Sequence, residues 1–530
     1  MIIRKQAPKA LGLNEPLRHA DHKRPVSRRD FIAQGFLTGG ATVVAPAMLG
    51  MALNPRSATA ATLSPDVWRN NICNIQLGAG KIPFICFDLA GGANIAGSNV
   101  LVGNQNGQLD VLSTAGYSKL GLPGNMLPNS STGTFIDTQF GLAFHSDSAF
   151  LRGMLMTTST ATRAMVSGAV IPARSENDTG NNPHNPMYGI ARAGARGQLL
   201  SLIGSQSSDS GGNSMAPAML MDPTVRPTKV DRPSDARGLV DTGDLAKMFP
   251  DPADTVKVME SIERISRDKL AAVDTKLPTD AALKQQVDCG YVKAASLADF
   301  SADTVDPTKD TNISAIFQPL GGISADGEFG KTAAVMKLVV DGMAGAGTIT
   351  MGGFDYHTGD RATGEARDFR AGVCMGACLE YAARTGKPLM LYVFSDGSLN
   401  SNGMIDNSTG GRGKGQWTGD NQSTAASFFL VLRPAGRPQI YTGGGSIPAA
   451  RRQQLGYFRA SGDVETSGSP GANSVVSLVD MVLLNYMALH GEQNLFGDAS
   501  HFPNSVLNSA GIDNWIAFNP IVNHTVSNPL

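Results

Sequence analysis

The sequence predicts a three-layer α/β fold, in which a mostly parallel central sheet is covered by helices on both faces. Several short apolar runs are continuous rather than alternating, as is typical of strands buried on both faces. Helical patterns lie between these runs, and this alternation indicates a parallel sheet. About 470 residues follow residue 60, enough for one elaborate domain or two.

Five apolar runs are expected to be strands of this sheet. In chain order they are KIPFICFD (81–88), AFLRGMLM (149–156), GTITMGGFD (347–355), KPLMLYVFSD (387–396) and ASFFLVLRP (426–434). In each run apolar residues follow one another without alternation, which favours the interior of a sheet over a strand with one wet face.

Five further segments have helical patterns. They are 186–204, 254–277, 330–346, 368–386 and 475–489. The first opens with Pro186 at a first-turn position, and the second has apolar residues at helical spacing. The fourth carries Cys374 and Cys378 four residues apart among small residues, which indicates close packing against a neighbour. The last is too short to cross a membrane and carries Asp480, so we expect a buried core helix.

Residues near 223–315 are more polar than their surroundings. They contain RPTKVDRPSD and a charged helix, and we expect them to form an insertion or cap outside the central sheet. The rest of residues 61–530 is then expected to form a single α/β domain.

The first sixty residues have the order of an export signal. Arg28 and Arg29 precede an uncharged stretch from Phe31 to Leu53, and SATAA (57–61) offers a cleavage site after Ala60. The paired arginines indicate the twin-arginine export machinery as a partner, and a periplasmic or secreted location. A membrane anchor is the alternative, because the stretch is about long enough to span, but its glycines, threonines and proline make it weakly hydrophobic.

Composition excludes some classes of partner. Residues 1–60 hold nine of the 44 basic and three of the 45 acidic residues, so removing them leaves 35 and 42 and a net charge of −7. A mildly acidic chain argues against nucleic acid as the main partner, and no segment after the signal resembles a membrane span. The five cysteines are Cys73, Cys86, Cys289, Cys374 and Cys378. They are odd in number and fit no zinc module, so we expect no disulfide framework.

Three of the predicted strands end on an aspartate: Asp88, Asp355 and Asp396. His357 follows Asp355 at the second position, so both side chains point the same way if the chain is extended. Open α/β sheets bind ligands at the carboxyl ends of their strands. Three carboxylates and one histidine there suit a divalent cation such as zinc, magnesium or calcium. Aspartate also starts turns without any metal, so a purely structural role stays open for each.

Two long loops accompany these strand ends. Residues 397–424 have almost no apolar content, and they carry Asp406, Arg412, Lys414, Trp417 and Asp420. Loops of this length are often functional, and this mixture suits an anionic or sugar-like group. Residues 173–190 lead from a strand-like run into a helix and carry Ser175, Thr179 and His184. A hydroxyl before a helix N-terminus suits a phosphate-transferring nucleophile, whereas a hydrogen-bonded turn explains the same residues without catalysis.

The segments DLAGGANIAGSN, GGFDYH and FSDGS resemble a group of exported bacterial proteins of unassigned function. That group is thought to belong to the alkaline phosphatase superfamily, alongside sulfatases and phosphoglycerate mutases. The resemblance covers most of the chain after the signal, in the order of the motifs. It implies an alkaline-phosphatase-like α/β fold, two metals at the strand ends, and attack on a phosphate or sulfate ester by a serine or threonine. Asp88, Asp355, His357 and Asp396 match metal-ligand positions, and the loop with Ser175, Thr179 and His184 would supply the catalytic group.

The sequence departs from that group at several positions. Asn94 stands where the relatives usually have an aspartate, Glu176 stands where a histidine is expected, and residues 397–434 contain no histidine. We therefore expect one of two functions. The first is an exported metal-dependent hydrolase of phosphate or sulfate esters, acting on an anionic ester or a carbohydrate. The second is a non-catalytic periplasmic or surface protein that uses the same fold for binding or assembly.

Overall fold

The computed structural model describes most of the chain. The described residues are 64–68, 80–175, 182–241, 251–274, 280–281, 284, 287, 290, 302–498, 502, 505, 507 and 511–530. The expected signal, 1–60, and Thr179 lie outside them. The described residues fall into two compact units, one within 61–73 and 242–299 and the other within 74–241 and 300–530.

A seven-stranded, mostly parallel sheet forms the centre of the larger unit, which confirms the α/β prediction. In spatial order its strands are β4 (Val166–Pro172), β11 (Ala426–Leu432), β8 (Leu389–Ser395), β1 (Phe84–Leu89), β7 (Ala344–Met351), β5 (Leu200–Gly204) and β6 (Thr228–Lys229). Strand β11 is antiparallel to both neighbours, and the strands from β8 to β6 are parallel to one another. The carboxyl ends of β4, β8, β1 and β7 therefore lie at the same edge as the start of β11.

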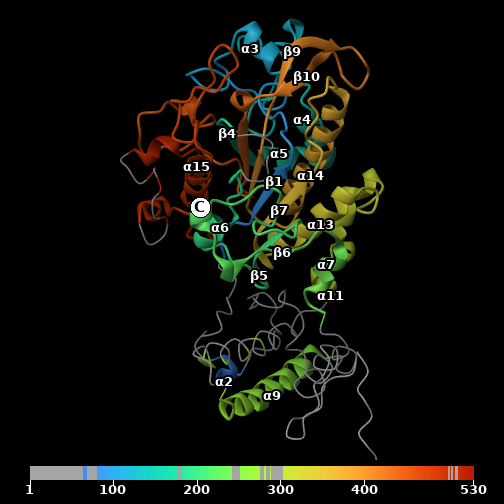
Figure 1. Cartoon of the computed structure of the whole chain (residues 1–530), viewed down its shortest axis with the longest axis vertical. Helices are drawn as coiled ribbons and strands as arrows, with labels where there is room; N and C mark the ends of the chain where they lie inside the picture. Colours follow the sequence, from blue (N-terminus) through green and yellow to red (C-terminus); the bar gives the residue numbers. More distant parts are fainter. Residues whose placement is uncertain are drawn as a thin grey trace, which may run out of the picture. The chain divides into compact units, whose positions relative to one another are not determined.

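Helices cover both faces of this sheet (Figure 1). On one face α6 (Met187–Arg192) and α15 (Val475–Ala488) share a buried apolar cluster with alternate strand residues such as Phe84 and Cys86. On the other face lie α13 (Gly327–Val340) and α14 (Ala362–Arg384). There Gly347 of β7 faces Val335 and Val339 of α13, and α14 contacts β8 and β11.

Among the described residues, the remaining α-helices other than α9 are short. The helices are α2 (Pro65–Trp68), α3 (Thr114–Lys119), α4 (Ala149–Thr157), α5 (Thr160–Ala164), α7 (Pro233–Gly238), α9 (Pro252–Ala271), α11 (Ala302–Val305) and α12 (Thr311–Phe317). In the described part of the chain, three antiparallel pairs stand outside the main sheet: β2 (Ile136–Asp137) with β3 (Phe144–His145), β9 (Leu399–Asp406) with β10 (Lys414–Asp420), and β12 (Val522–Asn523) with β13 (Thr525–Pro529).

Residues 149–156 are helical, so the prediction of a strand there was wrong. The hydroxyl of Ser148 accepts a hydrogen bond of 3.1 Å from the backbone N–H of Leu151 and caps α4. A short apolar run does not distinguish a buried strand from a buried helix. This run packs on α14, where the small residues allow the close contact that the sequence indicated: a side chain at Gly372 would clash with the carbonyl oxygen of Phe150.

Residues 186–204, expected as one helix, divide into α6 and β5. Helix α6 ends at Arg192, and Gly194 follows with φ +98°. This left-handed conformation commonly ends helices, and glycine adopts it without strain. The apolar residues that come next then pair with β7 as β5.

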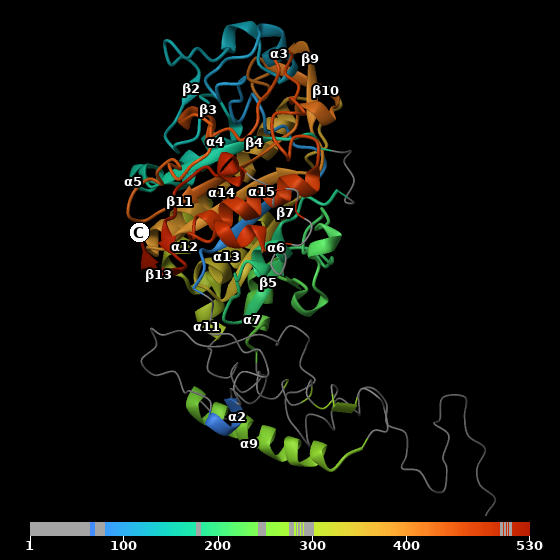
Figure 2. The ribbon, with the colours of Figure 1, turned by 90° about the vertical axis from the view of Figure 1, so that its left-hand side faces the viewer.

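Residues 397–424, expected as an irregular loop, contain the β9–β10 hairpin. The hairpin lies beside α3 at one end of the larger unit (Figure 2). Trp417 and Lys414 are buried in it. Asparagine and glycine are depleted in strands, so this composition indicates a loop although the segment pairs as strands.

The smaller unit contains α9, which the helical spacing of apolar residues predicts. Val256 and Met259 of α9 are buried. The carboxylate of Glu260 accepts hydrogen bonds from the backbone N–H and the hydroxyl of Ser64, at 2.6 and 2.7 Å. These contacts join α9 to the segment that contains α2.

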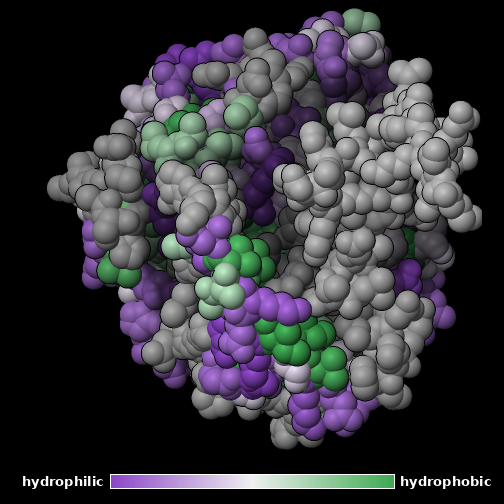
Figure 3. Space-filling view, turned by 60° about the horizontal axis from the view of Figure 1, so that its bottom comes forward, coloured by the Kyte–Doolittle hydropathy of each residue, from purple (hydrophilic) through white to green (hydrophobic). Residues whose placement is uncertain are grey.

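Exposed apolar side chains are distributed over several elements, for example Met156 of α4, Ile265 of α9, and Met404 and Ile405 of β9. On the face drawn in Figure 3, hydrophobic residues form small groups bordered by hydrophilic ones. Single exposed apolar residues are ordinary on protein surfaces. None of the described helices has the length and apolar character needed to cross a membrane.

Three cysteines, Cys86, Cys374 and Cys378, are buried and free. The latter two lie on the buried part of α14, in agreement with a packing role. Cys73 and Cys289 lie outside the described residues.

Candidate metal centre

Asp355 and His357 lie on one side of a short segment after β7, in which the backbone N–H of Tyr356 donates to the carbonyl oxygen of Phe354 at 3.0 Å. Gly353, with φ +83°, precedes this segment. Exposure then alternates, with Asp355 exposed, Tyr356 buried and His357 partly exposed. The two outward-facing side chains are in contact, with Oδ1 of Asp355 2.7 Å from Nε2 of His357.

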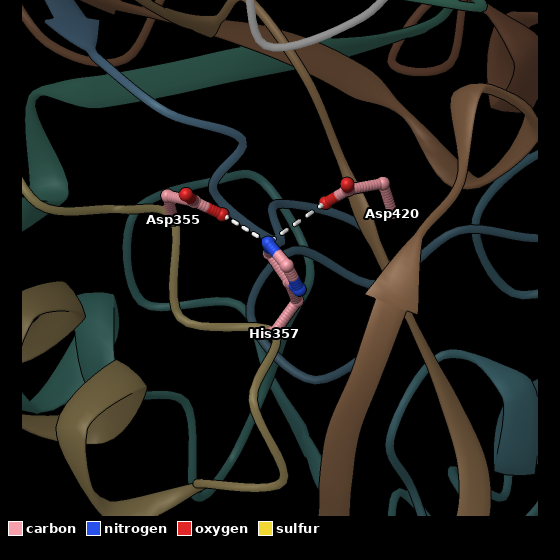
Figure 4. Close-up of side chains that lie close together, drawn as sticks. All are labelled: Asp355, His357 and Asp420. Carbon is pink, nitrogen blue, oxygen red and sulfur yellow. Dashed lines mark ion pairs between the residues drawn. The ribbon is translucent and has the colours of Figure 1, made fainter.

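Asp420, the last residue of β10, completes a group of three. Its Oδ1 lies 3.7 Å from Nε2 of His357, and Figure 4 shows both aspartates directed toward that nitrogen. The ligand atoms of all three residues lie within 4.8 Å of one another. Among the described residues, no other set of three histidine, cysteine or acidic side chains comes this close together. The antiparallel direction of β11 explains the location, because Asp420 shortly precedes its start at the carboxyl edge.

The spacing of these three atoms fits a small divalent cation. Zinc is bound at about 2.0–2.2 Å by imidazole nitrogen and carboxylate oxygen, so neighbouring ligands of a tetrahedral ion lie roughly 3.3 Å apart. The two separations from Nε2, 2.7 and 3.7 Å, lie on either side of that value. Side-chain rotations alone could therefore bring the three atoms into one coordination sphere.

The group is open to solvent and negatively charged. The side chains of Asp355 and Asp420 are 53 % and 51 % exposed, and that of His357 is 32 % exposed. With a neutral histidine the formal charge is −2, which a divalent cation would balance. Three protein ligands with access to solvent leave a position for a further ligand, as catalytic zinc sites do and closed structural sites do not.

Asp88, expected as a ligand, is instead enclosed by the segment at residues 213–214. Its carboxylate accepts hydrogen bonds from the backbone N–H groups of Asn213 and Ser214, at 2.7 and 2.8 Å, and from the Ser214 hydroxyl at 3.1 Å. Burial raises the pKa of Asp88 to about 7, and the nearby carboxylate of Asp396 adds to this effect. The structure does not bring Asp88 into the group with His357.

Asp396, which follows β8 directly, is also held by hydrogen bonds. Its Oδ1 accepts from the backbone N–H of Gly91 at 2.8 Å and its Oδ2 from the side-chain amide of Asn213 at 2.9 Å. Burial raises the pKa of Asp396. Asn213 thus bridges Asp88 and Asp396, and both carboxylates fix turns at the sheet edge beside the group of three.

Ser175 and His184, the described members of the expected catalytic loop, form a buried pair. The hydroxyl of Ser175 donates to the carbonyl oxygen of Asp396 at 2.7 Å, and its oxygen lies 3.0 Å from Nε2 of His184. Because a hydroxyl has one hydrogen, Nε2 is the donor in the second contact, the reverse of what a general base requires. Burial lowers the pKa of His184 to about 3. Both side chains are almost fully buried.

The basic residues of the hairpin have internal partners rather than a free binding face. Lys414 is buried, with Nζ 2.9 Å from Oε1 of Glu365 and 3.2 Å from Oδ2 of Asp147. Arg412 pairs with Asp147 as well. Both residues thus have structural partners, and their role in holding an anionic or sugar-like group stays a prediction.

His490 also has a structural role. Its Nε2 accepts a hydrogen bond of 3.0 Å from the backbone N–H of Ile82, and Nδ1 lies 2.8 Å from the carbonyl oxygen of Tyr486. His501 lies outside the described residues.

No family model matches the chain, and no match is found among the curated proteins or the solved structures.

Proposed function

We propose that the protein is a hydrolase of phosphate or sulfate esters that depends on one divalent cation held by Asp355, His357 and Asp420. The observation that carries this proposal is the convergence of these three side chains, half open to solvent, at the carboxyl edge of the sheet. Ligands of open α/β sheets bind at this edge.

Zinc is the first ion to test. One imidazole nitrogen with carboxylate oxygens suits zinc, whereas magnesium and calcium favour oxygen ligands alone. A cation bound there would supply Lewis acidity toward an oxygen of the ester. The two carboxylates would bind the cation. Nε2 of His357 would have to leave its contact with Asp355 and, without its hydrogen, donate its lone pair to the cation.

The proposal gives Ser175 no role as a nucleophile. Its hydroxyl is buried and donates to the carbonyl oxygen of Asp396, so it does not reach the partly exposed group of three. Solvent water is then the available nucleophile, and Thr179, outside the described residues, stays a candidate. The likeness to the alkaline phosphatase superfamily is part of the proposal, supported by the mostly parallel sheet and the GGFDYH segment. The paired arginines support export to the periplasm or beyond.

Metal content and ester hydrolysis test this function together. The full chain is purified without chelator and compared with the double variant Asp355→Ala/His357→Ala, by elemental analysis and by turnover of p-nitrophenyl phosphate and p-nitrophenyl sulfate. We expect about one equivalent of metal and measurable turnover of one ester in the native protein, and the loss of both in the variant. His524→Ala is the matched control, because His524 also contacts a carboxylate, Glu492 at 3.1 Å.

A second candidate function is metal-dependent binding without catalysis, in a periplasmic or surface assembly. The burial of Ser175 and His184 and the direction of their hydrogen bond favour it. This candidate is supported if the native protein binds metal, the double variant does not, and neither protein turns over either ester. Absence of metal from the native protein would contradict both.

A further inference from the structure

The two halves of the candidate metal centre come from different elements. Asp355 and His357 follow β7, whereas Asp420 ends the hairpin. Both halves contact the first two turns of α14 or Arg361, the residue directly before it.

Tyr356 attaches the first half to α14. It lies between the two ligands, and it points inward where they point outward. Its ring packs against Gly364, where an added Cβ would come within 2.8 Å of the ring. Its hydroxyl donates to Oδ1 of Asp368 at 2.8 Å, and it accepts from the backbone N–H of Asn94 at 3.2 Å.

Asp368 is in turn fixed from its other side. Its Oδ2 accepts a hydrogen bond of 2.7 Å from the side-chain amide of Asn99. Gly364 and Asp368 are four residues apart and so lie on the same side of α14. Both therefore contact the Tyr356 side chain from the same side of α14, one through the ring and one through the hydroxyl.

Arg361 and Glu365 attach the second half. The guanidinium of Arg361 lies over the ring of Trp417, with Cζ 4.4 Å from the ring centroid, and Nη1 donates to the carbonyl oxygen of Gly415 at 3.3 Å. Glu365 accepts hydrogen bonds from Arg361 at 2.8 Å and from Lys414 at 2.9 Å. Trp417 lies three residues before Asp420 in β10.

A direct contact joins the two halves as well. The backbone N–H of Gly359 donates to the carbonyl oxygen of Trp417 at 2.8 Å. The segment after His357 and the strand that carries Asp420 are therefore attached to each other and to the same two helical turns.

We propose that Tyr356, Asp368 and Arg361 are positioning residues that hold the backbones of His357 and Asp420 close enough for both side chains to reach one cation. This inference rests on the proposed cation site. Residues that orient metal ligands through hydrogen bonds typically change metal affinity by about 10- to 100-fold when they are replaced. A purely structural role would lower stability and leave the affinity unchanged.

The test is calorimetric titration of the metal-free full chain with Zn²⁺, for the native protein and the variants Tyr356→Phe and Arg361→Met. Each variant keeps most of the side-chain volume. After the Arg361 substitution, Glu365 keeps Lys414 and Arg152 as partners. We expect each variant to bind Zn²⁺ about tenfold more weakly or worse. Thermal unfolding in EDTA reports on stability separately.

Tyr486→Phe is the matched control. It also removes a buried hydroxyl, which donates to the carbonyl oxygen of Ile82 at 2.7 Å, at the opposite end of β1 from the site. We expect stability to fall and Zn²⁺ affinity to stay within about twofold. If Tyr356→Phe does not fold, Asp368→Asn replaces it, because it keeps the size of the side chain while offering one acceptor oxygen instead of two.

The outcomes separate this inference from the proposed function. Native protein that binds no Zn²⁺ would overturn the proposed function and this inference with it. Native protein that binds Zn²⁺, with variants that bind equally well, would overturn only the positioning role. Weaker binding in the variants but not in the control would support it.

Discussion

Burial determines the protonation of Asp88. The side chain is 0 % exposed in β1, and burial raises its pKa from 3.8 to about 7, against the opposing hydrogen bonds from Ser214 and Asn213. An unfolded chain loses this proton near pH 4, whereas the folded chain keeps it to near pH 7. Between those values the folded state binds more protons, so the stability contributed by Asp88 is present below pH 4 and falls as pH rises toward 7.

Asp88→Asn is expected to remove this dependence. One asparagine oxygen can accept the hydrogen bonds that Asn213 and Ser214 donate from the backbone, so the variant is expected to fold. Relative to the variant, the native protein is expected to lose about 1 kcal/mol of stability per pH unit between pH 5 and pH 7. Urea unfolding at several pH values measures the difference, and parallel curves for the two proteins would contradict the assignment.

At the level of single residues, the sequence indicates which carboxylates lie at the sheet edge. It does not indicate which of them lie close to His357. Asp88, Asp355 and Asp396 all follow apolar runs in the same way. What separates them is Asn213, which bonds both Asp88 and Asp396 from a distant part of the chain. Local patterns contain no signal for such a long-range contact. The contact between Asp355 and His357 could be predicted from the sequence, because the two residues are only two positions apart.

At the level of elements, the contact between α4 and α14 depends on glycine. Gly372→Ala would place a methyl group against the carbonyl oxygen of Phe150, which belongs to backbone and cannot rotate away. We expect a loss of about 1–3 kcal/mol, typical of overpacking. Gly327→Ala, where nothing lies within 4 Å, is the control and is expected to be neutral or slightly stabilising. Equal unfolding midpoints for the two variants would show that the contact is looser than described.

The hairpin explains why Asp420 was not predicted as a metal ligand. Its segment is rich in serine, asparagine and glycine, so the sequence indicates a loop and gives no register for its residues. Trp417 and Lys414 of β10 are buried. Their partners are Arg361, directly before α14, and Glu365, in its first turn, some fifty residues earlier. The available signal was the position of Asp420 shortly before the run at 426–434.

At the level of the whole molecule, the order of strands determines where the site lies. Strands β11 and β7 are separated in the sheet by β8 and β1, a distance of roughly 14 Å at about 4.8 Å per strand. The hairpin before β11 and the segment after β7 both extend over the carboxyl ends of the strands between them. The mostly parallel sheet was predictable from continuous apolar runs, and α13, α14 and α15 were predictable from helical patterns. The antiparallel direction of β11, which brings Asp420 to this edge, was not.

The measurement that tests the central claim most directly is Zn²⁺ titration of the metal-free full chain beside Asp420→Asn. The substitution keeps the size and shape of the side chain and removes one negative charge, at a position 51 % exposed where little packing is lost. We predict about one equivalent bound by the native protein and at least tenfold weaker binding by the variant. Equal binding by both proteins, or none by either, would contradict a cation centre at Asp355, His357 and Asp420.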